Sequence, residues 1–212
     1  NGVESDRIRD DFNQIKLDKG PIVSTILDTV YEEERRGSGL IYSGIYNSNS
    51  GINNLNQFIQ AEKITKDINP TYGSIQKLFS RNTDLISLCE DRVVRIQANK
   101  DAIFNADGNP QIIASNNVLG QTMPFSGDYG ISKNPESFTS DNYRAYFTDK
   151  SRSAVLRLSK DGLTPISEYG MSDWFKDNLR NYPKLVGSFD NVKEDYNLTL
   201  REVLNHLYQN KL

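Results

Sequence analysis

The chain has 212 residues, of which 36% are hydrophobic and 25% charged, and its formal net charge is −3. This length allows one or two domains with a buried core, and 11 Tyr, nine Phe and one Trp argue against wholesale disorder. The single Cys excludes an internal disulfide and multi-cysteine metal centres, and the single His excludes His-rich metal sites. No apolar run approaches the ~20 residues of a membrane span, and no basic block suggests a general nucleic-acid surface.

Residues 1–38 are expected to form an N-terminal arm or linker. The chain begins at Asn1 without an initiating Met or a secretory leader, and its first 19 residues are mostly polar. We therefore expect a processed or excised fragment of a longer polypeptide, with an arbitrary chain boundary or a disordered N-terminus as the alternative. The charged run at 31–36 is interpreted as a solvated linker or turn, or as one helical turn with Glu–Arg pairs.

Short strands joined by tight turns are expected between residues 39 and 114. About one residue in ten is Asn, and clusters of Asn, Asp, Gly and Ser separate short apolar runs. A strand candidate at 39–46 leads into a loop at 47–54, residues 58–64 fit a short helix or an irregular strand, and Asn69-Pro70 interrupts the chain. An antiparallel meander follows, with strands expected at 75–79, 85–89, 93–97, 102–104 and 112–114, turns at 81–83, 90–92 and 99–101, and a hairpin turn at Asp107-Gly108.

The second half predicts a long loop and then a second meander. Residues 120–139 show little periodicity, and a loop of this length is usually functional or packed against a partner. Strands are expected at 143–148, 154–159 and 165–167, joined by a Thr-Asp-x-x-Arg turn and an Asp-Gly turn in the pattern of a propeller blade.

The C-terminal part predicts two helices around a hairpin. Ser172 is a candidate N-cap for a helix over 172–181 that would bury Trp174, Phe175 and Leu179 and would stop before Pro183. Strands are expected at 184–189 and 196–200. A capping box, Thr199-x-x-Glu202, predicts a last helix over 199–210, so the change from strand to helix is ambiguous.

These patterns predict a mainly β fold of antiparallel meanders resembling propeller blades, with short helices at 172–181 and 199–210. The expected organisation is an arm at 1–38, a β-rich, propeller-like and possibly incomplete domain at 39–200, and a C-terminal helix at 201–212.

Two pairs of carboxylates are the first candidates for chemistry. Glu90-Asp91 and Glu194-Asp195 both fall in expected turns beside basic residues. A glycosidase needs two carboxyl groups about 5–9.5 Å apart across a sugar, and neighbours along an extended chain point apart. We therefore interpret both pairs as structural turns.

The remaining candidates also favour structural roles. Asn105, Asp107 and Asn109 resemble the first half of a calcium loop, but the Gly is misplaced and no acidic residue closes the site, so a hairpin turn is expected. Cys89 lies in an apolar run and is expected to be a buried, inert thiol, and His206 is expected at a surface or an interface. No catalytic, cofactor or metal site is predicted, although loop Tyr and Asn residues are suited to binding glycans.

The longer motifs resemble a family of virion structural proteins of tailed bacteriophages. The motifs that carry this resemblance are GLIYSGIY at 39–46, NPTYGSIQKL at 69–78, NNVLG at 116–120, GDYGISKNPESF at 127–138, YRAYFTDKSR at 143–152, AVLRLSKDGLTPIS at 154–167 and GMSDWF at 170–175. Together they span roughly residues 20–200. The most similar members are the muzzle protein of crAss-like podoviruses and the nozzle proteins of other short-tailed phages, which carry propeller-like β domains.

The resemblance implies a non-enzymatic subunit of the virion tail, assembled in the bacterial host cytoplasm. Its partners would be copies of itself in a ring, other tail proteins and the rest of its own cleaved precursor, with contact to packaged DNA or the host surface and no membrane span. It would contribute to channel closure and DNA retention. One departure is the expected C-terminal helix, because the family pattern would continue as strand after Leu200. A receptor- or glycan-binding propeller domain is the alternative, and a sugar hydrolase is a more distant one.

Overall fold

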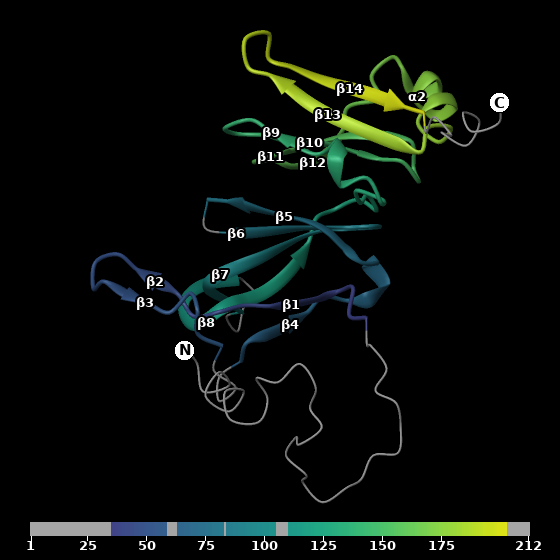
Figure 1. Ribbon diagram of the computed structural model, residues 1–212. Coiled ribbons are helices and arrows are strands. Elements are labelled where there is room, and N and C mark those ends of the chain that lie inside the picture. The colour runs from purple at the N-terminus through teal and green to yellow at the C-terminus, as the bar shows by residue number, and fades with distance from the viewer. Residues whose placement is uncertain (1–34, 59–62, 83, 105–109, 203–212) are drawn as a thin grey trace, which may run out of the picture. The chain divides into compact units, whose positions relative to one another are not determined.

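A computed structural model gives the structure of residues 35–58, 63–82, 84–104 and 110–202 (Figure 1). The mainly β prediction is confirmed, since the regular structure of these residues consists of antiparallel sheets, one short α-helix and two short 3₁₀ helices, η2 (Pro70–Tyr72) and η3 (Pro135–Ser137). Several expectations lie outside the described residues: the arm up to residue 34, the turn at Asp107-Gly108, the calcium-like positions Asn105, Asp107 and Asn109, and His206 with the rest of the last helix from residue 203.

The chain forms two compact units. Unit 1 contains Asn1–Ile68 and Gln97–Gln121, and unit 2 contains Asn69–Ile96 and Thr122–Leu212. The chain passes from one unit to the other after Ile68 and then again within two long strands, β7 (Val93–Phe104) and β8 (Pro110–Pro124). The β-rich segment at 39–200 therefore contributes to two units, and each is described by itself.

Unit 1 contains two small antiparallel sheets. Strand β1 (Gly39–Ile41) pairs with β4 (Thr65–Asp67), and β2 (Tyr46–Asn47) pairs with β3 (Ile52–Asn53). The expected loop at 47–54 is thus the tip of a hairpin. Asn47 makes this turn because its side-chain oxygen accepts hydrogen bonds from the backbone N–H groups of Asn49 and Ser50.

The first meander is a four-stranded sheet with the order β5-β6-β7-β8, in which β5 (Ile75–Arg81) and β6 (Asp84–Cys89) pair antiparallel. The expected turn at 99–101 is wrong, because β7 runs through it and joins the two strands expected at 93–97 and 102–104. Pairing along a sheet overrides the turn preference of single residues here. The strand expected at 112–114 is part of β8, which continues to Pro124.

The second meander is confirmed as a sheet with the order β12-β11-β10-β9, but the strand expected at 165–167 lies at 162–165, because a two-residue turn at 160–161 lets Gly162 pair with Ser159. Its strands are β9 (Thr139–Ser140), β10 (Ala145–Asp149), β11 (Ala154–Ser159) and β12 (Gly162–Pro165). The expected Thr-Asp-x-x-Arg turn joins β10 to β11, and the Asp-Gly turn joins β11 to β12. Gly162 has a φ of +114°, which explains why glycine suits this turn.

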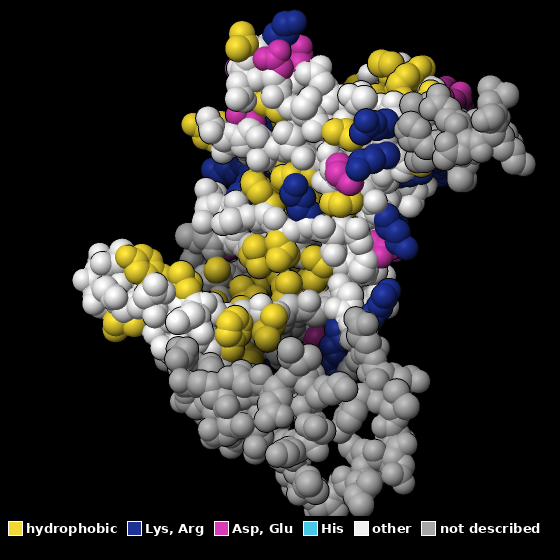
Figure 2. Space-filling model, in the orientation of Figure 1, with side chains coloured by type: hydrophobic (Ala, Val, Ile, Leu, Met, Phe, Trp, Pro, Cys, Tyr) yellow, Lys and Arg dark blue, Asp and Glu magenta, His cyan; other side chains and the backbone are white. Residues whose placement is uncertain are grey.

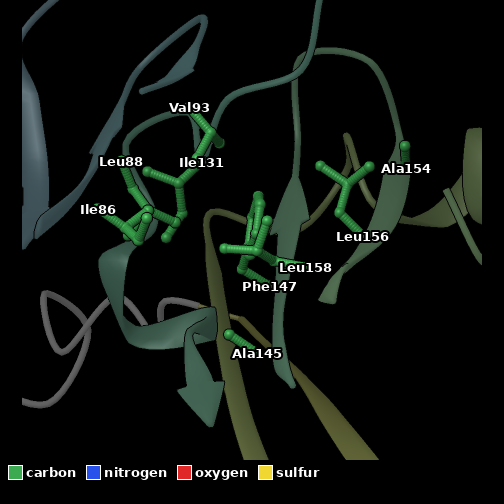
Figure 3. Close-up of a cluster of buried hydrophobic side chains, with 9 residues drawn as sticks. All are labelled: Ile86, Leu88, Val93, Ile131, Ala145, Phe147, Ala154, Leu156 and Leu158. Atoms are coloured by element: carbon green, nitrogen blue, oxygen red, sulfur yellow. The ribbon is translucent and has the colours of Figure 1, made fainter. Parts of the chain in front are cut away.

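Strands β10 and β11 are buried on both faces. One face packs its side chains against β6 and β7 in a cluster that includes Leu88, Ile131, Phe147 and Leu156 (Figure 3). The opposite face carries Val155, which packs with Leu179, Leu185 and partly buried aromatic and aliphatic side chains. Burial on both faces explains why each strand carries neighbouring apolar residues, at 145–147 in β10 and at 154–156 in β11.

The hairpin of β13 (Lys184–Asp190) and β14 (Asp195–Arg201) confirms the expected strand pair. The first helix is confirmed as α2 (Ser172–Asn178), although it ends at 178 and not at the expected 181. Three further details differ. Met171 occupies the N-cap position, and no side chain caps the helix. Trp174 is 46% exposed, whereas Leu179 is fully buried, so the helix buries a narrower stripe than expected. Residues 199–201 belong to β14, so the last helix does not begin at 199.

The long loop expected at 120–139 is shorter than predicted, because both of its ends belong to strands. Its middle part packs against unit 2, to which it belongs. Residues 120–124 belong to β8, and Thr139 begins β9. The N–H of Ile131 donates to the carbonyl of Cys89 at 3.0 Å, and Ile131 and Ser137 are fully buried. A Cβ on Gly130 would lie 2.1 Å from the carbonyl oxygen of Glu90, so only glycine allows this close approach.

Candidate functional site

The Thr-Asp-x-x-Arg turn organises a buried polar cluster in unit 2. Asp149 is fully buried, and its Oδ2 accepts hydrogen bonds at 3.0 Å from the N–H of Gly130 and from Nη1 of Arg152. Its Oδ1 accepts from the hydroxyl of Ser132 at 2.8 Å and from the N–H of Arg152 at 3.1 Å. Four donors, one of them the Arg152 guanidinium, satisfy this carboxylate, so its geometry fits a role in joining segments 130–132 and 149–152.

The predicted pair Glu90-Asp91 lies beside this cluster, in the turn between β6 and β7. Glu90 accepts hydrogen bonds from the hydroxyl and the N–H of Ser74, and Lys133 Nζ lies 3.8 Å from its carboxylate. The Ser74 hydroxyl holds the pKa of Glu90 below its ordinary value, although burial opposes this shift. Asp91 lies 3.4 Å from Nη1 of Arg152. Both carboxylates are thus paired within the protein.

A polar pocket of about 470 Å³ opens at this turn. Its lining includes Glu90 and Asp91, the cations Lys133, Lys150 and Arg180, and the buried side chain of Asn134. Four separate segments of unit 2 supply these residues. None of the described residues that line the pocket is aromatic, so this lining offers no stacking surface of the kind that glycan binding commonly uses.

The second predicted pair, Glu194-Asp195, lies at the mouth of a different pocket, of about 330 Å³. Its walls are mainly apolar and aromatic and include Tyr146, Phe175 and Tyr196. Tyr146 stacks on Tyr196 with ring centroids 5.5 Å apart, and the Tyr196 hydroxyl donates to the carbonyl of Ser137 at 2.7 Å. The structure thus assigns the two carboxylate pairs to different pockets rather than to one cleft.

Cys89 is fully buried, as expected, and burial raises the pKa of its thiol. In the part of the chain that the structure describes, no group of three or more His, Cys, Asp and Glu residues is placed to hold a metal ion. Within the same residues, no helix is both long enough and apolar enough to cross a bilayer.

Exposed hydrophobic side chains gather in unit 1, on and beside the β2–β3 hairpin, and Figure 2 shows such side chains at the surface of this hairpin. Ile45, Tyr46, Ile52 and Leu55 are each about half exposed, at 46%, 57%, 54% and 56%, and Ile41 on β1 is 66% exposed. No Asp, Glu, Lys or Arg occurs from residue 37 to 61. We call residues 41–58 the apolar hairpin segment. An uncharged, exposed apolar surface of this kind is typical of a protein interface.

Among the described residues of unit 2, three aromatic side chains are exposed. Tyr143 is 79% exposed, Tyr169 80% and Trp174 46%, and Trp174 contacts the edge of the Phe175 ring. None of the three lines either pocket described above.

A scan against protein-family models finds no family that matches the chain, and a search of curated proteins finds no relative.

The sequence predicts the Thr-Asp-x-x-Arg turn and the Glu90-Asp91 turn, but it does not predict that the two turns contact each other. Nothing in the spacing predicts that Gly130 and Ser132 reach Asp149, since the contacts join residues 19 and 17 positions apart through tertiary packing. The charge-free stretch at 37–61 was a signal available in the sequence, and it coincides with the apolar hairpin segment.

Proposed function

We propose that this chain is a non-enzymatic structural subunit of a tailed-bacteriophage virion, of the muzzle or nozzle type at the tail tip. It would act by packing against copies of itself and against other tail proteins, and it would contribute to channel closure, DNA retention and host contact. The resemblance of its long motifs suggests this class. The observation that carries the assembly role is the apolar hairpin segment, which exposes large hydrophobic side chains without any charge.

The small sheets support the same role. β1–β4, β2–β3 and β13–β14 are each two-stranded among the described residues. Isolated two-stranded sheets are marginally stable in water, and their unpaired edges can accept a strand from another chain. Contact with a neighbouring subunit would both cover these edges and stabilise the strands.

The free energy gained by burying these apolar side chains indicates weak association through this segment alone. Full burial of one large apolar side chain contributes about 1.5–3 kcal/mol, so covering half of each side chain contributes about 1 kcal/mol. Six such side chains lie between residues 41 and 58. Their sum, about 6 kcal/mol, is comparable to the cost of association, about 4–15 kcal/mol. Self-association should therefore depend on concentration, and a closed ring would need further contacts.

Analytical ultracentrifugation of the chain tests the assembly role over about 10 μM to 1 mM, the range in which weak contacts of this size are populated. We expect the mean mass to rise with concentration. The double variant Tyr46→Ser with Ile52→Ser should stay monomeric. Val192→Ser is the matched control, because Val192 is 92% exposed in the β13–β14 turn and lies outside the segment. A wild-type chain that is monomeric throughout, or an equal effect of the control, would contradict the proposal.

The virion assignment has a separate test. Peptide mass spectrometry of purified particles from a phage that encodes this chain should detect peptides from the described strands at a constant ratio to other tail proteins. Particles that infect normally without the chain would refute the assignment, even if the chain self-associates.

A receptor- or glycan-binding domain of a phage tail is the second candidate, and the exposure of Tyr143, Tyr169 and Trp174 favours it. Aromatic rings that face solvent can stack on sugar rings. A glycan array should then give hits that Trp174→Ala weakens. An array without hits would leave the exposed rings without this role.

A further inference from the structure

We propose that the polar pocket in unit 2 binds a small oxyanion, a carboxylate or a phosphate group. The pocket has a volume of about 470 Å³, within the range of sites that hold small molecules. The inference depends on the charges and hydrogen-bond donors that line it, and it is independent of the proposed assembly role.

Two cations in the lining have no carboxylate partner among the described residues. Lys150 is only partly exposed, and no ion pair with it occurs in the ranges that the structure covers. Arg180 donates one Nη2 hydrogen bond to the carbonyl of Ser151 at 2.9 Å, which leaves other guanidinium donors available. A cation held at the wall of a pocket without a counter-ion favours an anionic ligand.

The carboxylates in the lining do not cancel this charge. Asp91 lies 3.4 Å from Arg152, which also pairs with the buried Asp149. Glu90 accepts its hydrogen bonds from Ser74 and faces Lys133 at 3.8 Å. Three carboxylates thus face four cations, with Lys133, Arg152, Lys150 and Arg180 on the positive side, and the local charge remains positive.

The side chain of Asn134 adds a neutral donor. Asn134 is only 5% exposed and lines the pocket. Its backbone N–H donates to Ile131, and its carbonyl accepts from Ser137, whereas its side-chain amide has no hydrogen-bond partner among the described residues. The amide is not among the fully buried polar groups that lack a partner in the described residues, so it reaches the pocket space and is free to donate to a ligand there. An oxyanion accepts from both an amide and a guanidinium, and these charge-assisted bonds are the stronger ones.

Titration followed by ¹H–¹⁵N NMR tests the proposal, because the side-chain NH₂ group of Asn134 gives its own signals, assigned by their loss in Asn134→Ser. The full chain is titrated with inorganic phosphate and, separately, with glutarate as a probe for carboxylates. Ionic strength is kept constant with sodium chloride so that screening does not change. We expect a saturable shift of the Asn134 signals, and the anion that binds more tightly identifies the ligand class.

Lys150→Gln should weaken binding about tenfold, the effect of losing one charge-assisted contact. Among the described residues, this variant removes no side-chain hydrogen bond or ion pair. Arg180→Gln should weaken it by a similar factor, with its urea midpoint measured to establish that the pocket wall is intact. Lys160→Gln is the matched control, since Lys160 is an exposed lysine outside the pocket. A shift that does not saturate with either anion, or an equal loss in Lys160→Gln, would overturn the proposal.

Discussion

The substitution Asp149→Asn tests the buried polar cluster that joins two segments of unit 2. The carboxylate accepts four hydrogen bonds, two on each oxygen, from Gly130, Ser132 and Arg152. An asparagine keeps the shape but accepts on only one side, so about two of the four bonds are lost and an NH₂ group faces other donors. The substitution also leaves Arg152 without its closest counter-ion.

The expected cost follows from these contacts. Hydrogen bonds to charged groups contribute about 1.5–3 kcal/mol each, so the loss of two predicts about 3–6 kcal/mol. The side chain of Arg152 is 33% exposed and also lies near Asp91, so water and this second carboxylate offset part of the loss. We therefore expect unit 2 to be destabilised by about 3 kcal/mol, the lower end of the cost of breaking a buried ion pair.

Urea unfolding followed by the fluorescence of Trp174 measures this cost. Trp174 is the chain's one tryptophan and lies in unit 2, so its signal reports on that unit. With a slope of about 1–3 kcal/mol per molar urea, the midpoint should fall by about 1–3 M. The control Asp161→Asn removes the same charge from an exposed turn and should change stability by less than about 0.5 kcal/mol. If Asp149→Asn unfolds as the control does, the cluster does not hold the two segments together.

Three further predictions concern the packing of unit 2. Gly187→Ala should destabilise unit 2 by about 2–4 kcal/mol in the same urea assay, because the new Cβ would lie 2.1 Å from the carbonyl oxygen of Ser137. An unchanged urea midpoint would contradict this close packing. Burial raises the pKa of Tyr196, so the folded state keeps a proton that the unfolded state releases, and stability should fall as pH rises above the ordinary tyrosine value of 10.0. Urea midpoints from about pH 8 to pH 11 should show this decline in the wild type, and Tyr196→Phe should reduce it without abolishing it, because Tyr129 and Cys89 of unit 2 also have raised pKa values. Equal slopes would argue against the buried hydroxyl. Cys89 is fully buried and its thiol pKa is raised by burial, so a thiol reagent should label it only in urea; rapid labelling of the native protein would refute its burial.

Local signals were sufficient for much of the β structure. The alternation and turn residues around β10, β11 and β12 predicted the second meander closely, because the Asp-Gly turn and the short apolar runs act within a few residues. The same holds for the hairpin of β13 and β14. Where a local signal competed with sheet pairing it was misleading: the Asn-Lys-Asp sequence at 99–101 suits a turn, yet β7 continues through it.

By itself, the sequence determined the fold class, several of the turns and the lack of a short-range catalytic motif, since these depend on residues close together along the chain. Only the tertiary structure decided that Trp174 faces solvent while Leu179 is buried, because exposure depends on which sheet covers the helix. Only it decided that Gly130 contacts Asp149 and that Asn134, Lys150 and Arg180 share one pocket. These residues come from separate segments that the packing of strands brings together. Their spacing along the sequence does not predict these contacts.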